Sequence, residues 1–62
     1  MKTWIFKSTS LRGSIDIIYN ERDIQVILNK KFDTAALCEI KKYLEKSRGL
    51  GFKIIEIEEL NI

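Results

Sequence analysis

The sequence predicts a single α+β domain, residues 1–62, in which a four-stranded mixed, mainly antiparallel sheet carries one helix packed on one face. Two patterns support this fold class. Four segments alternate apolar with polar residues, which is the period of a strand, whereas one segment repeats its apolar residues every three to four positions, which is the period of a helix. The chain contains no proline and no internal repeat, so no linker divides it. The predicted element order is β-β-β-α-β.

The first two strands are expected at residues 2–8 and 14–19. In the first of them, Trp4 and Phe6 alternate with residues that point to the other face, and aromatic and β-branched types predominate. Residues 8–13 between the strands contain serine, threonine and glycine, which favour a turn. We therefore expect these two strands to form an antiparallel hairpin.

A third strand is expected at residues 24–28, with Ile24, Val26 and Leu28 on one face. The preceding residues 20–23 are all polar, and a run of this length and composition is typical of a tight hairpin connection. The first three strands are therefore expected to form an antiparallel meander.

The single helix is expected between Asp33, which is placed to cap its first turn, and Gly49, which can end it in the left-handed conformation with Leu50 folded back on the last turn. The fourth strand follows at residues 52–60 and is expected to run parallel to the first and third strands. The sequence leaves open which of those two strands it joins. The apolar stripe of the helix consists of Ala36, Leu37, Ile40, Tyr43 and Leu44.

Each predicted strand also has an isoleucine among the positions that alternate with its buried ones. The buried set is expected to be Trp4, Phe6, Ile15, Ile17, Tyr19, Ile24, Val26, Leu28, Ile55 and Ile57. The four isoleucines of the open face are Ile5, Ile18, Ile27 and Ile54. Covering one large aliphatic side chain stabilises an interface by about 1.5–3 kcal/mol, so a row of four predicts a face-to-face homodimer or a docked partner protein. The alternative is that these residues occur on solvated strands for their strand propensity alone.

A second candidate site is expected where the helix begins, because the predicted topology collects several cations and hydroxyl groups there. The cations of this possible anion or nucleic-acid contact are Lys7, Arg12, Lys30 and Lys31. Free backbone N–H groups at the start of a helix would support the binding of a phosphate. Acidic residues expected at the same end partly cancel this charge, and the alternative is a solvated basic loop.

The composition offers few residues that could catalyse a reaction or bind a metal ion. The chain has no histidine and a single cysteine, which excludes an imidazole base and the usual zinc ligand sets. Cys38 has no pattern of neighbouring cations that would activate it. Glu56 and Glu58 could share a divalent cation, but a charged strand that resists edge pairing explains them more simply. We expect a protein that is not an enzyme and has no cofactor and no metal.

These features together predict a small protein-protein interaction module that acts as an adaptor, an assembly factor or an inhibitor of a larger protein. It is expected to be cytoplasmic, because the sequence shows neither a secretory signal nor an apolar run long enough to span a membrane. The alternative function is a nucleic-acid-binding accessory protein, although the net charge of +2 is small for that role. The identity of the partner, and a host or phage origin, stay open.

The ending of the chain, Gly51–Glu58, resembles the C-terminal part of the small cyanobacterial phycobilisome linker polypeptides, which close with a glycine, a lysine and alternating aliphatic residues. The paired glycines of that family are absent here, and the N-terminal half has no matching motif. The resemblance concerns the way a small sheet ends and implies no function.

Overall fold

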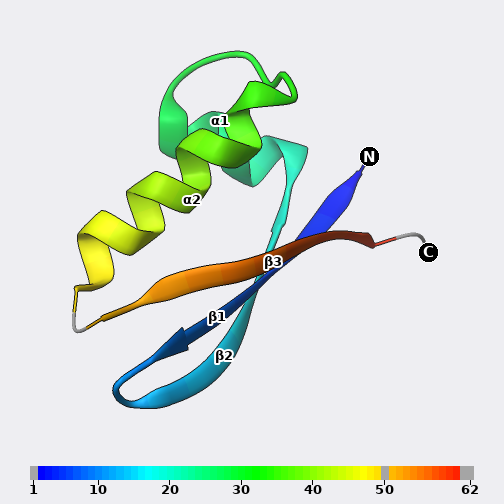
Figure 1. Cartoon of the computed structure of the whole chain (residues 1–62). Helices are drawn as coiled ribbons and strands as arrows, with labels where there is room; N and C mark the ends of the chain where they lie inside the picture. The colour runs from blue at the N-terminus through cyan, green and yellow to red at the C-terminus, as the bar shows by residue number, and fades with distance from the viewer. Residues whose placement is uncertain (1, 50, 61–62) are drawn as a thin grey trace.

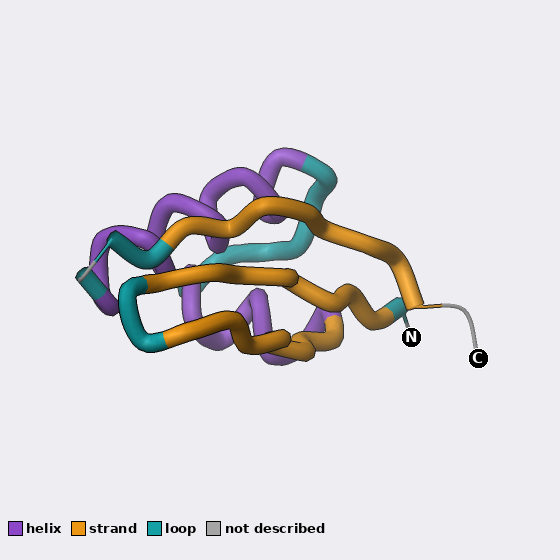
Figure 2. Tube along the Cα trace, turned by 60° about the horizontal axis from the view of Figure 1, so that its bottom comes forward, coloured by secondary structure: helices purple, strands orange, loops and turns teal. Residues whose placement is uncertain are grey.

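The computed structural model describes residues 2–49 and 51–60, which form a three-stranded antiparallel sheet and two helices. Both helices lie on the same side of the sheet (Figures 1 and 2). The expectation of a four-stranded sheet with one helix is therefore wrong, although the α+β class holds. The elements are β1 (Thr3–Ser10), β2 (Gly13–Asn20), α1 (Glu21–Leu28), α2 (Ala35–Arg48) and β3 (Lys53–Leu60).

The strand order is β2-β1-β3, so β1 is central and has an antiparallel neighbour on each side. The β1–β2 hairpin is confirmed, with Phe6 opposite Ile17 across its strands. The last strand was expected to be parallel to the first, but β3 is antiparallel to β1, with Phe6 opposite Ile57. The reason is that two helices, in place of a strand and a helix, return the chain to the hairpin end before β3 begins (Figure 1).

The expected third strand is instead the helix α1, and the expected hairpin turn before it is the helix cap. The Asn20 carboxamide oxygen accepts a hydrogen bond from the Asp23 backbone N–H at 2.8 Å, and the Asn20 N–H donates to the Asp23 carboxylate at 3.1 Å. This reciprocal pair is a capping box, which satisfies N–H groups that an uncapped helix leaves without partners. Asn29 ends the helix in the left-handed conformation, at φ 55°.

The helix expected after Asp33 is confirmed as α2. The Asp33 carboxylate accepts a hydrogen bond from the Ala36 N–H at 2.9 Å, which is the capping role expected of it. Gly49 follows the last turn at φ 60°, where a residue with a side chain would be strained. The expected contact of Leu50 with that turn lies outside the described residues.

The core lies between β1 and the helices. Trp4 of β1 stacks on Phe32, which lies between α1 and α2, with ring centroids 4.9 Å apart. The Phe6 ring meets Tyr19 edge to face at 5.9 Å. The buried apolar residues are Trp4, Phe6, Ile24, Ala36, Ile40, Leu44, Phe52 and Ile54. Because the sheet has only three strands, α1 supplies part of the core through Ile24.

The expected buried set is wrong at three exposed residues, Ile15, Val26 and Ile55, and it omits Ile54, which is buried. A β-bulge in β3 explains why Ile54 is buried and Ile55 is exposed. Along β1, Lys7 lies opposite Glu56 but Ser8 lies opposite Ile54, so Ile55 is an extra residue in β3. An extra residue reverses which side chains face the core. Val26 is exposed because α1 turns it away from the sheet.

Neither of the two helices in the described ranges combines the length and the apolar character that crossing a membrane requires.

Candidate functional site

The four isoleucines expected on the open face do not form a row. Ile5 and Ile18 are register partners on β1 and β2, and Ile18 is 56% exposed. Ile27 lies on α1 and packs against the core, and Ile54 is buried because of the bulge in β3. The structure therefore leaves one pair, Ile5 and Ile18, on the sheet face away from the helices.

The expected basic set is also divided. Lys7 on β1 forms an ion pair with Glu58 at 3.1 Å, and Lys30 forms one with Glu39 of α2. Lys30 and Lys31 follow α1, whereas Arg12 lies in the β1–β2 turn at the opposite end of the molecule (Figure 1). The structure therefore does not bring the four cations together, because Lys30 and Lys31 lie at the opposite end of the molecule from Arg12 and Lys7 lies along β1 in its ion pair.

Charges on the open face of the sheet interact mainly with one another. Hydrogen bonding to Glu58, followed by the charge of Glu56, raises the pKa of Lys7. Glu56 and Glu58 also share a hydrogen bond, which raises the pKa of Glu56 and, together with Lys7, lowers that of Glu58. Lys7 is thus held as a cation by β3, so it is poorly placed to contact an external anion.

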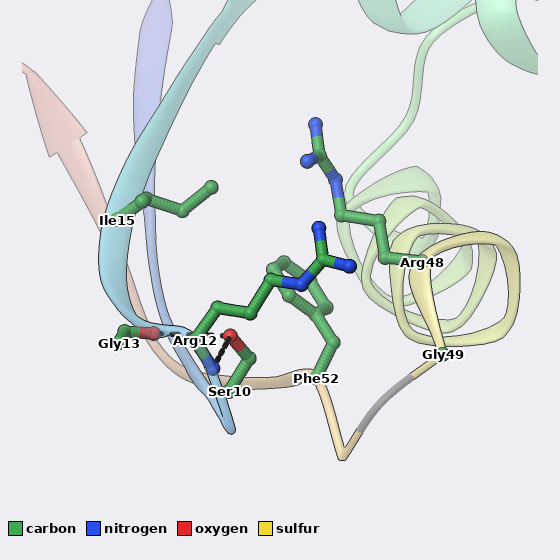
Figure 3. A pocket seen from close by; sticks show the side chains of 7 residues that line it. All are labelled: Ser10, Arg12, Gly13, Ile15, Arg48, Gly49 and Phe52. Carbon is green, nitrogen blue, oxygen red and sulfur yellow. Dashed lines mark hydrogen bonds between the residues drawn. The ribbon is translucent and has the colours of Figure 1, made fainter.

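A hollow of about 260 Å³ opens at the hairpin end of the molecule, between the β1–β2 turn and the end of α2. We call it the Arg12–Arg48 hollow. Figure 3 shows the two arginine side chains reaching across it from opposite sides, with Phe52 and Ile15 beside them. Its lining residues are Ser10, Arg12, Gly13, Ile15, Arg48, Gly49 and Phe52.

Local structure positions Arg12 in the turn. The Ser10 hydroxyl accepts a hydrogen bond from the Arg12 N–H at 3.2 Å and donates one to the Gly13 carbonyl at 3.1 Å. Gly13 has φ 118°, a conformation that few other residues adopt. These contacts fix the backbone from which the Arg12 side chain extends over the hollow.

Arg48 enters the hollow from the last turn of α2. Its guanidinium carbon is 5.4 Å from the centroid of the Phe52 ring, a cation–π contact. The Phe52 N–H donates to the Gly49 carbonyl at 2.9 Å, so the chain turns tightly after α2 and brings Phe52 under Arg48. Arg48 is not recognisable as a residue of this site from the sequence, because no local signal shows that the hairpin turn and the helix end meet.

The Arg12–Arg48 hollow has no carboxylate among its lining residues. Neither guanidinium forms an ion pair or donates a side-chain hydrogen bond within residues 2–49 and 51–60, in contrast to Lys7 and Lys30. Two cations that face one space repel each other, and an anion between them would remove this repulsion. The site can bind an anionic group, with apolar surface from Ile15 and Phe52 alongside.

The two edges of the sheet differ in chemistry. β2 has a continuous register with β1 and one charged residue, Asp16, among its eight. β3 has four charged residues among its eight, a bulge at Ile55, and an Ile54 N–H that donates to the Glu45 carboxylate of α2 at 2.9 Å. Charge, bulges and side-chain capping all discourage the pairing of an edge with another strand. Only β2, of the two edges, is left open to pairing.

Within the part of the chain that the structure describes, no group of three His, Cys, Asp or Glu residues could hold a metal ion. Cys38 is exposed on α2.

Comparison with known proteins adds no further assignment: no family model, no curated protein and no solved structure matches the chain.

Proposed function

We propose that this chain is a small non-enzymatic protein-protein interaction module that forms a homodimer, in which β2 of one copy pairs antiparallel with β2 of another. The observation that carries the proposal is the open edge of β2, eight residues long with a single charge. Pairing two such edges would join two three-stranded sheets into one sheet of six strands. This arrangement replaces the expected face-to-face contact of four isoleucines, because Ile27 lies on α1 and Ile54 is buried.

Apolar surface along β2 supports the choice of this edge. Ile18 is 56% exposed on the open face, and Ile15 is 48% exposed on the other. A second β2 strand would cover part of both side chains, because cross-strand neighbours on each face are in contact. The two-fold symmetry of a homodimer requires the same strand on both sides of the interface, and antiparallel pairing of β2 with itself meets this requirement.

The size of the chain supports association. A domain of about 60 residues buries only about 60% of the surface that its unfolded chain exposes, and small domains commonly gain stability from oligomerisation. The role proposed for the dimer is that of a cytoplasmic adaptor, assembly factor or inhibitor that presents its joined sheet to a larger protein.

The decisive experiment is the solution mass by light scattering, for the wild type and for Ile18→Lys. We expect a dimeric wild type and a folded, monomeric Ile18→Lys variant, because the lysine places two charges near the two-fold axis. Val26→Lys is the matched control, since Val26 is an exposed aliphatic residue of α1 and not of β2. A wild type that stays monomeric at high concentration, or an Ile18→Lys variant that stays dimeric, would contradict the proposal.

The alternative of a nucleic-acid-binding accessory protein is weakened, because the four cations predicted for it do not lie together. Lys7 forms an ion pair with Glu58, and Lys30 forms one with Glu39. One observation still favours anion binding, namely that Arg12 faces Arg48 across a hollow without acidic lining.

A further inference from the structure

We propose that the Arg12–Arg48 hollow binds a nucleoside 5′-phosphate, with the phosphate held between the two guanidinium groups and the base against Arg48 and Ile15. The ligand chemistry is the same in a free mononucleotide and in the phosphorylated 5′ end of a single strand. The site shares Ile15 with the β2 edge proposed above as the dimer interface, but the two proposals are measured by different experiments.

The charge of the site matches a phosphate monoester. Such a group carries a charge of about −1.5 to −2 at neutral pH, which two arginines balance better than they would balance a carboxylate. A guanidinium donates hydrogen bonds in a planar fork that suits phosphate oxygens. The guanidinium groups of Arg12 and Arg48 donate no side-chain hydrogen bond to the described residues. The two side chains reach over the hollow from opposite walls (Figure 3).

The size and the apolar lining of the hollow suit a ligand that is larger than a phosphate group. The volume of the hollow is about 260 Å³, which leaves room for more than a phosphate group. Ile15 and Phe52 give it apolar surface, and the Arg48 guanidinium already lies over an aromatic ring. Bases stack on arginine planes and aromatic side chains in the same manner, which suits a flat heterocycle beside the phosphate.

The structure around the hollow is held in place before any ligand arrives. The turn that carries Arg12 is closed by the Ser10 hydroxyl, and Phe52 is 7% exposed and fixed by its hydrogen bond to Gly49. Ligand binding therefore orders only the two arginine side chains, which lowers its entropic cost.

The test is titration of the whole chain with adenosine 5′-monophosphate at low salt, followed by calorimetry and by NMR shifts of the Arg12, Arg48 and Phe52 amides. Arg12→Gln and Arg48→Gln are each expected to weaken binding by about tenfold or more, because each removes one charged contact to the phosphate. Arg22→Gln is the matched control, since Arg22 is an exposed arginine on α1, and it should leave the affinity unchanged. The solution mass of every variant is measured as well, so that loss of ligand binding is not confused with loss of the dimer.

Further probes separate the parts and sources of the ligand. Adenosine and inorganic phosphate should each bind at least about tenfold more weakly than the nucleotide, because each lacks one half of the contacts. A 5′-phosphorylated single-stranded oligonucleotide that binds much more tightly than the mononucleotide would identify a strand end as the source, and equal affinity would identify the free nucleotide. The proposal is overturned if the nucleotide does not bind at millimolar concentration, if both glutamine variants bind as the wild type does, or if a phosphotyrosine peptide binds more tightly.

Discussion

Arg12 and Lys7 belong to the same hairpin, yet their electrostatic surroundings are opposite. Lys7 points to the open face of the sheet, where Glu58 of β3 lies 3.1 Å away. Arg12 lies in the turn, where it forms no ion pair with the described residues, and faces Arg48. A surface ion pair contributes little to stability, but it removes its lysine from the set of cations available to a ligand. The ion pairs therefore leave Arg12, unlike Lys7, available to an external anion.

The charge cluster on the open face predicts a measurable change in Glu58. Because hydrogen bonding from Glu56 and the neighbouring Lys7 together lower the pKa of Glu58, replacing Lys7 by glutamine should raise that pKa. A carboxyl group with a lowered pKa contributes stability above its unfolded pKa and loses it as the pH falls through the folded pKa. The loss of stability on acidification should therefore be smaller in Lys7→Gln than in the wild type.

NMR titration of the glutamate side chains measures the Glu58 pKa directly. Lys31→Gln is the control, because Lys31 lies in the loop after α1, at the opposite end of the molecule from the β1–β2 turn. An unchanged Glu58 pKa in Lys7→Gln would show that the ion pair is absent in solution.

The element that departs most from expectation is α1, and its N-terminal cap is the cause. Residues 20–23 have the composition of a turn, but Asn20 and Asp23 exchange hydrogen bonds in the reciprocal pattern that begins a helix. Apolar residues then recur at Ile24, Ile27 and Leu28, which is helical spacing, while Val26 is exposed. The alternation of Ile24, Val26 and Leu28 is equally compatible with a strand, so an eight-residue segment could not be assigned by period alone.

The cap should be visible in the stability of the protein. Asn20→Ala removes the side chain that accepts from the Asp23 N–H, and loss of such a cap costs about 1 kcal/mol. Urea unfolding, followed by circular dichroism, measures this loss. Arg22→Ala, an exposed position in the same first turn, should change stability by no more than about 0.5 kcal/mol. Equal stabilities for Asn20→Ala and wild type would indicate that the capping box does not support α1.

The whole molecule is held together by one thin core beneath a small sheet. Three strands present few inward-facing side chains, so both helices must contribute, through Ile24 from α1 and through Ala36, Ile40 and Leu44 from α2. The stability of a chain this size is about 3–9 kcal/mol at ordinary values per residue. A single core substitution therefore removes a large fraction of the total.

Ile24→Ala and Val26→Ala distinguish the observed fold from the expected one. A third strand would bury both side chains on one face, whereas α1 buries Ile24 completely and leaves Val26 74% exposed. Ile24→Ala should cost about 2–5 kcal/mol, because it leaves a cavity in the core. Val26→Ala should stay within about 0.5 kcal/mol of the wild type, as surface substitutions usually do. Chemical denaturation of the two variants gives the comparison, and similar losses in both would argue for the four-stranded fold.

Prediction from sequence succeeded where a local rule decides the outcome. The β1–β2 hairpin follows from alternation on both sides of a glycine-containing turn, and α2 follows from its length, from Asp33 and from Gly49. It failed at α1, where the segment is short, and at the end of β3, where one extra residue reverses the burial of Ile54 and Ile55. Of the candidate site residues, Ile5 and Ile18 lie side by side on β1 and β2 and Arg12 lies in a turn, whereas the other members of each set lie elsewhere. The roles predicted for these residues stay predictions.

Local sequence patterns are enough to predict the α+β class, the hairpin, the long helix and the aromatic core of β1, because these depend on periodicity and on capping residues that act within a few positions. Three features are visible in the folded chain alone: β3 is antiparallel to β1, β2 is an edge of the sheet, and Arg12 faces Arg48. Those features depend on contacts between segments far apart in the chain. Burial and charge pairing select among such contacts in the folded molecule as a whole, so no local pattern predicts them.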